Sequence, residues 1–472
     1  MSFATVEFYI FFLVVFSIYI LLAHKQQNIF LLAASYIFYA YWDWRFLSLL
    51  FVSSTVDYFC GLMIGRHEGT KAAKWYLNLA LVVNLTFLGF FKSFNFFISS
   101  LNQSLTWLGL DANRLQLHVI LPLGISFYTF QSLGYIIDVY RGQVKPIRRY
   151  TDYLLFVSFF PQLIAGPIER AGHLYRQIAN KRVLSWDRIK VGAYLIYWGL
   201  FKKVFVADHC AILAERLLSD PSQYSGAQLL VSLYAFAFQI YCDISGYTDI
   251  ARGVAKMMGF DLTINFRLPY FSTNISDFWR RWHMSMTFWF RDYVFFPVLV
   301  RTRGNAYFAS FLTLLCISLW HSISLNSIFR GIYFGAAVAV FHFIKSKGAP
   351  AAAAARNRSV QMLGALASGL FTFHIVCLGW VFFYPSDIKN VLGIFTRICQ
   401  FLQPGVFFVE LRGLIALTAV LIFVEIWQAL ARDEFVLLKA NFAVQAVLYW
   451  VMFWLLFGSG TNSSLPFIYF GF

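Results

Sequence analysis

Long apolar runs repeat along almost the whole chain and are separated by short polar segments. Runs of about 17–25 apolar residues are typical of helices that cross a bilayer. In the first half the pattern predicts spans over 6–23, 28–41, 46–64, 75–97, 119–137, 150–163 and 189–206. In the second half it predicts spans over 229–250, 308–321, 331–343, 362–383, 391–402, 414–429 and 443–457. Because several runs are short, we expect about 11 crossings together with re-entrant or half-spanning segments.

The composition supports a membrane protein. Of the 472 residues, 60% are hydrophobic and only 13% are charged, whereas soluble domains carry about twice that charged fraction. The sequence therefore predicts an all-α polytopic membrane protein in which residues 1–472 form a single domain around a central cavity. Small residues and flanking charges over 346–358 predict a surface loop before the last helices.

The chain is basic, with 38 Lys and Arg residues against 22 Asp and Glu residues and a net charge of +16. In a polytopic protein such an excess is typical of cytoplasmic loops that face anionic membrane lipids. The basic residues are scattered over many loops without a nucleic-acid motif, so we expect no nucleic-acid partner. The six cysteines show no paired spacing, which argues against a zinc site or a disulfide frame.

One imidazole follows a long uncharged run. Residues 308–320 contain no charge, and His321 comes directly after them. An ionisable side chain at membrane depth is costly and usually faces the interior of a bundle or a wet cavity. Two interpretations stay open from this residue alone: a buried histidine satisfied by neighbouring helices, and a functional group in a cavity.

A second polar stretch covers residues 265–297, which are too polar for a lipid-facing helix. Charged, imidazole and indole side chains lie close together in it: Asp277, Trp279, Arg280, Arg281 and His283. Asn274 or Ser272 is a suitable cap for a helix that begins near Ser276. The stretch fits an interfacial amphipathic helix, and it fits equally a cavity wall that binds an anionic, aromatic-containing ligand.

Two further windows place polar groups inside apolar runs. Residues 121–132 contain a proline, a glycine and several hydrogen-bonding side chains, and residues 238–249 contain Asp243 and Asp249. Carboxylates inside a membrane begin proton or cation paths, but more often they pair with a basic side chain and hold helices together. We favour the second role for Asp243 and Asp249.

Several motifs occur in a characteristic order: LPLGISFYTFQSLGYIIDVYRG, FFPQLIAGPIER, GLFKK, QIYCDISGYTDIARG, NFRLPYFSTNISDFWRRWHMSMTFWFRDY and LWH. Together they resemble the membrane-bound O-acyltransferases, and in particular the bacterial branch typified by alginate O-acetyltransferase and the teichoic-acid D-alanylation membrane protein. The resemblance covers nearly the whole chain. Each motif alone is weak, whereas the ordered set is highly specific.

The resemblance implies acyl transfer from a cytoplasmic thioester to a hydroxyl group. His321 then matches the family's membrane histidine and acts as a general base, which suits an imidazole. His283 or Asn274 is expected to help stabilise the oxyanion. The residues expected at the acyl donor come from the same polar motif and from GLFKK: Asp277, Trp279, Arg280, Arg281 and Lys203.

The C-terminal segment, 466–472, also resembles this branch, whose aromatic tail carries a tyrosine. The resemblance makes Tyr469 a candidate acyl relay, although a tyrosine in such a tail is more often an aromatic anchor at the membrane interface. The chain departs from the branch just after His321. The branch usually has glycine, then Trp-Gly and His-Gly, and this chain has Ser322, Arg330-Gly331 and Phe334-Gly335.

The sequence thus predicts an O-acyltransferase, most simply an O-acetyltransferase, that modifies an exported cell-envelope polysaccharide. The resemblance implies acetyl-CoA as donor, no permanently bound cofactor, and residence in the bacterial inner membrane. It also implies a periplasmic acyltransferase partner and polysaccharide export machinery. Two alternatives stay open. One is a transporter or flippase that uses Asp243, Asp249 and His321 as a proton path, and the other is a catalytically silent scaffold of an export complex.

Overall fold

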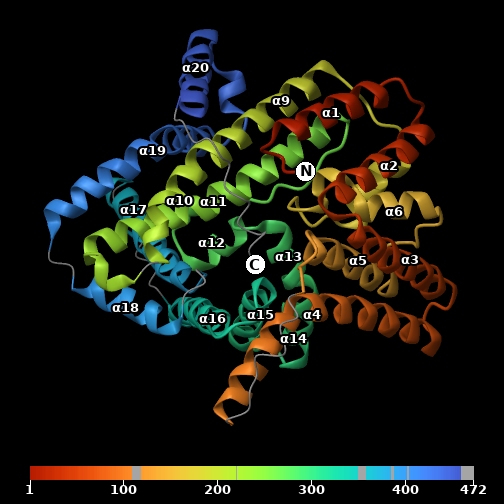
Figure 1. The fold of residues 1–472 in the computed structure, drawn as a ribbon, viewed down its shortest axis with the longest axis horizontal. Coiled ribbons are helices and arrows are strands. Elements are labelled where there is room, and N and C mark those ends of the chain that lie inside the picture. The colour runs from red at the N-terminus through yellow and green to blue at the C-terminus, as the bar shows by residue number, and fades with distance from the viewer. Residues whose placement is uncertain (109–118, 219, 349–357, 384–386, 401–402, 459–472) are drawn as a thin grey trace. The chain divides into compact units, whose positions relative to one another are not determined.

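The computed structural model describes residues 1–108, 119–218, 220–348, 358–383, 387–400 and 403–458 (Figure 1). Every regular element in these ranges is a helix, which confirms the predicted all-α class. The helices group into two compact units. The N-terminal unit comprises Met1–Ile196 and Thr248–Thr263, and the C-terminal unit comprises Tyr197–Tyr247 and Ile264–Phe472. The single domain over residues 1–472 stays a prediction.

The N-terminal unit is built around α3, which packs against α4, α5 and α6, while α2 packs against α6 (Figure 1). Its helices are α1 (Val6–Tyr19), α2 (His24–Asp43), α3 (Arg45–Arg66), α4 (Lys71–Trp107), α5 (Ile125–Tyr140), α6 (Tyr150–Ser158), α7 (Phe160–Leu163) and α8 (Ala171–Ala179). The division between the two units falls inside two long helices, α9 (Trp186–Leu200) and α11 (Gly226–Met257).

The C-terminal unit holds the remaining helices. They are α10 (Asp208–Ala214), α12 (Ile275–Arg281), α13 (Met284–Phe290), α14 (Phe296–Arg301), α15 (Ala306–His321), α16 (Leu325–Ser346), α17 (Arg358–Trp380), α18 (Ile388–Cys399), α19 (Pro404–Ala431) and α20 (Phe442–Gly458). Two π-helical segments are η1 (Phe201–Ala207) and η5 (Arg291–Phe295). The 3₁₀ turns are η2 (Glu215–Leu217), η3 (Pro221–Gln223), η4 (Pro269–Phe271), η6 (Val381–Phe383) and η7 (Val436–Lys439).

Six helices of the described ranges are long and apolar enough to cross a membrane. They are Arg45–Arg66, Lys71–Trp107, Gly226–Met257, Leu325–Ser346, Ser359–Phe383 and Pro404–Ala431, and shorter apolar helices cover Val6–Tyr19, Ala306–His321 and Phe442–Gly458. The protein is therefore a multi-pass membrane protein. The count of about 11 crossings, which allowed for tilted or short spans, stays a prediction. Most of the predicted surface loop over 346–358 lies outside the described residues.

Two predicted spans of the N-terminal unit differ from the structure because of glycine and proline. The run over 119–137 becomes helical only at Ile125, after Gly124 with φ of 73°. A side chain at Gly124 would meet the Leu163 carbonyl oxygen at 2.4 Å, so the turn requires glycine. The run over 150–163 divides into α6 and α7 at Phe159, whose non-helical backbone precedes Pro161 in the first turn of α7.

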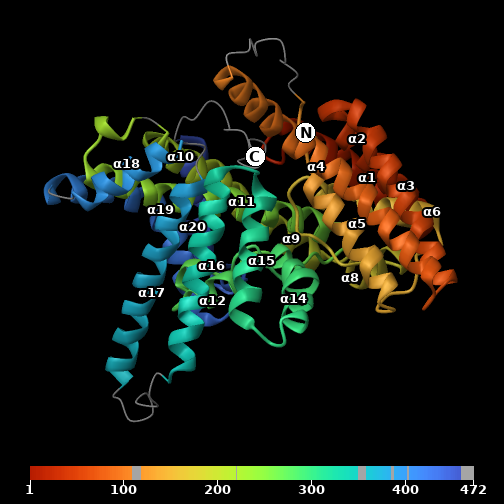
Figure 2. The ribbon, with the colours of Figure 1, turned by 90° about the horizontal axis from the view of Figure 1, so that it is seen from below.

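In the C-terminal unit, α15 and α16 lie side by side and make the most extensive helix pair (Figure 2). Two glycines one turn apart on α16 face α15. A Cβ on Gly331 would lie 2.8 Å from the Leu315 Cα, and one on Gly335 would lie 2.7 Å from the Phe311 ring. Small residues spaced in this way let membrane helices approach closely. The end of α15, which carries His321, is thereby held against α16.

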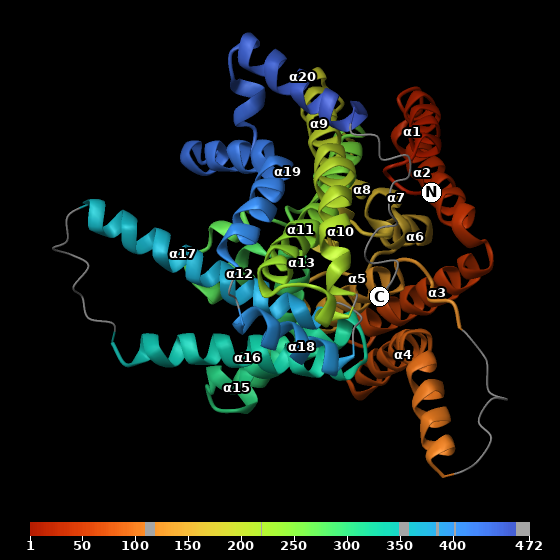
Figure 3. The ribbon, with the colours of Figure 1, turned by 60° about the vertical axis from the view of Figure 1, so that its left-hand side comes forward.

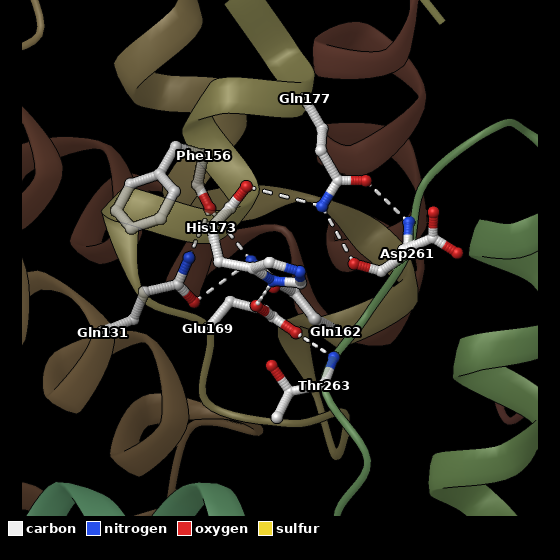
Figure 4. Close-up of polar contacts among 8 residues, drawn as sticks. All are labelled: Gln131, Phe156, Gln162, Glu169, His173, Gln177, Asp261 and Thr263. Atoms are coloured by element: carbon white, nitrogen blue, oxygen red, sulfur yellow. Dashed lines mark hydrogen bonds and ion pairs between the residues drawn. The ribbon is translucent and has the colours of Figure 1, made fainter. Parts of the chain in front are cut away.

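A polar network in the N-terminal unit fixes residues 261–263 to α8 (Figure 4). The Glu169 carboxylate accepts hydrogen bonds from the Thr263 backbone N–H at 2.5 Å and from the His173 ring at 2.7 Å. The Gln177 side chain pairs with the Asp261 backbone, donating to its carbonyl oxygen and accepting from its N–H. Because Glu169 is only 1% exposed, these bonds satisfy a buried charge.

Candidate active site

A cavity lies inside the C-terminal unit. In this unit α12 packs against α16 and α17 (Figure 3). Its volume is about 10 Å³, which is room for one water-sized group. Five helices and one 3₁₀ turn line it: Ile240 and Ile244 from α11, Trp279 and Trp282 from α12 and its end, Leu314, Ile317, Ser318 and His321 from α15, Arg330 and Phe334 from α16, Trp380 from α17, and Phe383 from η6.

His321 is the last residue of α15 and lines this cavity with only 7% of its surface exposed. Its ring packs edge-on against Trp320 at 4.6 Å and against Phe383 at 5.1 Å, measured between ring centroids. Aromatic contacts on two sides restrict the imidazole to few orientations. The apolar run that predicted α15 thus ends at an imidazole that lines a small, mostly apolar cavity.

The polar motif around α12 forms the predicted short helix. The Asn274 side chain accepts a hydrogen bond from the Asp277 N–H at 2.9 Å, so Asn274 is the N-cap. Asp277 pairs with Arg281 at 2.8 Å and lies 3.8 Å from Arg280, as the spacing on one helix predicts. Arg280 is two-thirds exposed. Among the described residues, these four side chains lie outside the cavity lining.

Trp279 belongs to the same helix, and its indole faces the cavity. The Trp279 Nε1 atom is buried, and no described residue accepts its hydrogen. A buried N–H without an acceptor costs about 1–3 kcal/mol relative to a paired one. Such a donor at a cavity wall is well suited to a carbonyl oxygen of a bound ligand.

His283 is fully buried and holds a left-handed backbone conformation, with φ of 42°. Non-glycine residues rarely adopt this conformation, and where they do the surrounding structure usually fixes it. Here Asn265 fixes the conformation. Its backbone carbonyl accepts a hydrogen bond from the Met284 N–H at 2.7 Å, and its side chain accepts hydrogen bonds from Ser285. The His283 ring contacts Trp320 at 6.3 Å, which in turn contacts His321.

Lys203 lies in a buried cluster of charges. It lies in the π-helical segment η1, only 2% exposed, and its Nζ lies 2.8 Å from Oδ1 of both Asp208 and Asp243. A buried ammonium between two carboxylates is already neutralised, which argues against the predicted contact with donor phosphates. The pairing supports the structural role expected for Asp243. In the N-terminal unit, Asp249 likewise pairs with Arg252 at 3.1 Å.

Residue-by-residue inspection of the sequence did not find every group in the cavity. Trp380 and Phe383 end the apolar helix α17 and its 3₁₀ extension, and nothing in that apolar pattern distinguishes them from lipid-facing residues. Asn265 is the first residue of the polar stretch 265–297, and no local pattern indicates that it fixes the backbone at His283. Tyr469, the candidate acyl relay, lies outside the described residues.

Comparisons with known proteins agree with this arrangement. The sequence profile of the membrane-bound O-acyltransferase family matches residues 147–384. The chain is 40% identical over 407 residues to the probable alginate O-acetylase AlgI of Pseudomonas aeruginosa, which covers 85% of this chain and 75% of the relative. It is 33% identical to a peptidoglycan O-acetyltransferase of Helicobacter pylori, covering 80% and 75%.

The similarity extends to a teichoic acid D-alanyltransferase of Bacillus subtilis. The two sequences are 29% identical over 285 residues, which is 55% of this chain and 68% of the relative. The family profile covers His321, the polar motif around α12, and all the helices that line the cavity. The chain belongs to the membrane-bound O-acyltransferase family.

Proposed function

We propose that the chain is an O-acetyltransferase that modifies a cell-envelope polysaccharide, with acetyl-CoA as donor. The observation that carries the proposal is a single cavity lined by His321 and by Trp279, whose buried Nε1–H has no acceptor among the described residues. Relatives named as an alginate O-acetylase and a peptidoglycan O-acetyltransferase support acetyl as the acyl group and a cell-envelope polymer as the acceptor.

In the proposed reaction, His321 removes the proton from an acceptor hydroxyl as that oxygen attacks the thioester carbonyl. A C–O bond forms, and negative charge develops on the carbonyl oxygen, to which Trp279 Nε1–H donates. The C–S bond then breaks, and the departing sulfur takes the proton from the imidazolium of His321. The histidine returns to its neutral form, so no cofactor or oxidant is consumed.

The other predicted residues take supporting roles in this proposal. Arg280 is exposed at the edge of α12 and is suited to the donor phosphates. Asn274, Asp277 and Arg281 hold α12 in place, and with it Trp279.

His283 is a positioning residue that supports Trp320, and through it His321. Lys203 has a structural role, since it pairs with Asp208 and Asp243. Tyr469 remains the candidate relay.

The proposed setting is the bacterial inner membrane. The donor binds from the cytoplasm, and the acetyl group reaches a polymer outside it, either directly or through a periplasmic acyltransferase partner. Polysaccharide export machinery is the expected assembly. These partners are suggested by the relative named as an alginate O-acetylase. Thioester hydrolysis by the purified protein, with and without a polysaccharide acceptor, tests the reaction separately from the assembly.

The decisive variants are His321→Gln and His321→Ala in the full-length protein. Loss of a positioned general base lowers turnover by about 100-fold to 10,000-fold. His342→Ala is the matched control, because His342 lies half-buried on α16 outside the cavity lining. Thiol release from acetyl-CoA at the wild-type rate by a folded His321→Gln protein would refute the proposal.

A further inference from the structure

A groove lies in the N-terminal unit, between the start of α3 and the middle of α4, and its volume is about 560 Å³. Both helices are long and apolar enough to cross a membrane. Val52 and Ile120 on its walls are about half exposed, so the groove opens outward onto the hydrocarbon of the bilayer. Most of its lining is apolar: Phe46, Leu49 and Val52 from α3, Phe87 and Phe91 from α4, and Val119 and Ile120 from the segment before α5, together with Arg45 and Ser48.

Aromatic contacts fix the shape of this groove. The Phe46 ring stacks on Trp42 at 5.2 Å and meets Phe91 edge-on at 5.9 Å, measured between ring centroids. Arg45 and Val52 lie two turns apart on α3, so the groove follows the helix for about 10 Å. That length is about a third of the hydrocarbon core of a bilayer. In a membrane such a space is filled by a lipid chain, because lipid tails are as apolar as leucine side chains.

An ion pair stands at the Arg45 end of the groove. The Arg45 Nη2 atom lies 2.6 Å from Asp43 Oδ2, and Nε donates to both carboxylate oxygens. The pair is accessible, since 62% of the Arg45 side chain and 14% of the Asp43 side chain are exposed. Tyr41 and Trp44, its neighbours in the sequence, are exposed by 60% and 75%. Because tyrosine and tryptophan gather at the membrane–water interface, the pair lies at the level of the lipid headgroups.

The ion pair carries one positive and one negative charge, and their sum is zero. A headgroup with a net negative charge is attracted by Arg45 but repelled by Asp43. A zwitterionic headgroup matches both members of the pair, because its phosphate lies at the guanidinium and its ammonium lies near the carboxylate. The charges at the groove therefore favour a zwitterionic lipid over an anionic one.

We propose that this groove binds one zwitterionic phospholipid, with an acyl chain between α3 and α4 and the headgroup on Asp43 and Arg45. The bound lipid fills the space between the two helices and stabilises their packing. The site is independent of the proposed acyl transfer, because its residues belong to the N-terminal unit and His321 belongs to the C-terminal unit.

Native mass spectrometry of the delipidated full-length protein tests the site. The protein is titrated with phosphatidylethanolamine and, in parallel, with phosphatidylglycerol that carries the same acyl chains. We expect one tight site for the ethanolamine lipid, with an affinity about twofold to fivefold above that of the glycerol lipid, which is the effect of one exposed ion pair. Equal affinities, or a preference for the glycerol lipid, would overturn the proposal. So would a tight dimer of the chain that excludes lipid from the groove.

Variants locate the bound lipid. Val52→Trp fills the groove and should weaken binding of the ethanolamine lipid by at least about tenfold. Val82→Trp is the matched control, because Val82 is an exposed residue of α4 that does not line the groove. The double variant Asp43→Asn with Arg45→Gln should bind both lipids equally. Arg66→Gln, at the other end of α3, should keep the preference. A preference that survives in the double variant would overturn the headgroup contact.

Thermal unfolding of the wild-type protein gives a measurement that needs no variant. Phosphatidylethanolamine should raise the thermal midpoint more than phosphatidylglycerol does, because a ligand stabilises the fold in proportion to its affinity. An equal or reversed order of the two lipids would overturn the proposal.

Discussion

Gly331 on α16 lies so close to Leu315 on α15 that a Cβ on the glycine would come within 2.8 Å of the leucine Cα. Because that atom belongs to the backbone, the neighbouring helix cannot move it aside cheaply. The contact sets the distance between the helix that carries His321 and the helix that carries Arg330. The geometry of the cavity thus depends on a residue that does not line it.

The first prediction follows from this contact. Gly331→Ala should destabilise the protein by about 1–3 kcal/mol, because an added methyl group overpacks the α15–α16 interface. It should also lower thioester turnover. Gly364→Ala is the matched control: Gly364 lies within α17, and a Cβ there would meet nothing within 4 Å. Thermal unfolding in detergent measures the stability of both variants, and a thioester assay measures their turnover. Equal stability of the two variants would contradict the packing argument.

The second prediction concerns the hydrogen bond donor in the cavity. Trp279→Phe keeps an aromatic ring at the wall but removes Nε1–H, and it should lower kcat by roughly tenfold, the effect of one lost hydrogen bond. Trp282→Phe serves as comparison, since Trp282 also lines the cavity and its Nε1 is not among the buried donors without an acceptor. If Trp279→Phe affects KM alone, the indole binds substrate without stabilising the transition state.

The third prediction concerns the buried ion pairs of η1. Lys203→Met leaves Asp208 and Asp243 without their shared cation and should cost about 3–5 kcal/mol. The triple variant that adds Asp208→Asn and Asp243→Asn should recover much of this loss, because it removes the unbalanced charges. Thermal midpoints of the three proteins measure the effect. A stable Lys203→Met protein with a raised KM for acetyl-CoA would instead support the predicted contact between Lys203 and the acyl donor.

The fourth prediction is a dependence of stability on pH. The hydrogen bond to Glu169 raises the pKa of His173 above its usual 6.5, against the opposing effect of partial burial. Since the folded-state pKa is the higher one, the stabilisation is complete below about pH 6.5 and is lost as the pH rises through the folded-state pKa. The difference in thermal midpoint between wild type and His173→Gln should therefore shrink from pH 6 to pH 8.

Local patterns determined the parts of this protein that depend on neighbours in the sequence. Apolar runs of membrane length predicted an all-α membrane protein, because a bilayer offers the backbone no hydrogen bonds and a helix satisfies its own. Helix spacing likewise predicted the Asn274 cap and the Asp277–Arg281 pair, which lie within one or two turns of each other. The ordered motifs predicted the family that the comparisons confirm.

Only the tertiary structure decided which of these groups meet. His321 shares its cavity with Arg330 and Phe383, which follow it by 9 and 62 residues, and Lys203 is paired with Asp243, which follows it by 40 residues. No local pattern encodes such contacts, since they depend on how far α15, α16 and α17 approach one another. Close packing at Gly331 and Gly335 sets the approach of α16 to α15, and close packing of Gly379 on Phe334 sets the approach of α17 to α16. At these positions a residue without a side chain is needed to let the helices approach.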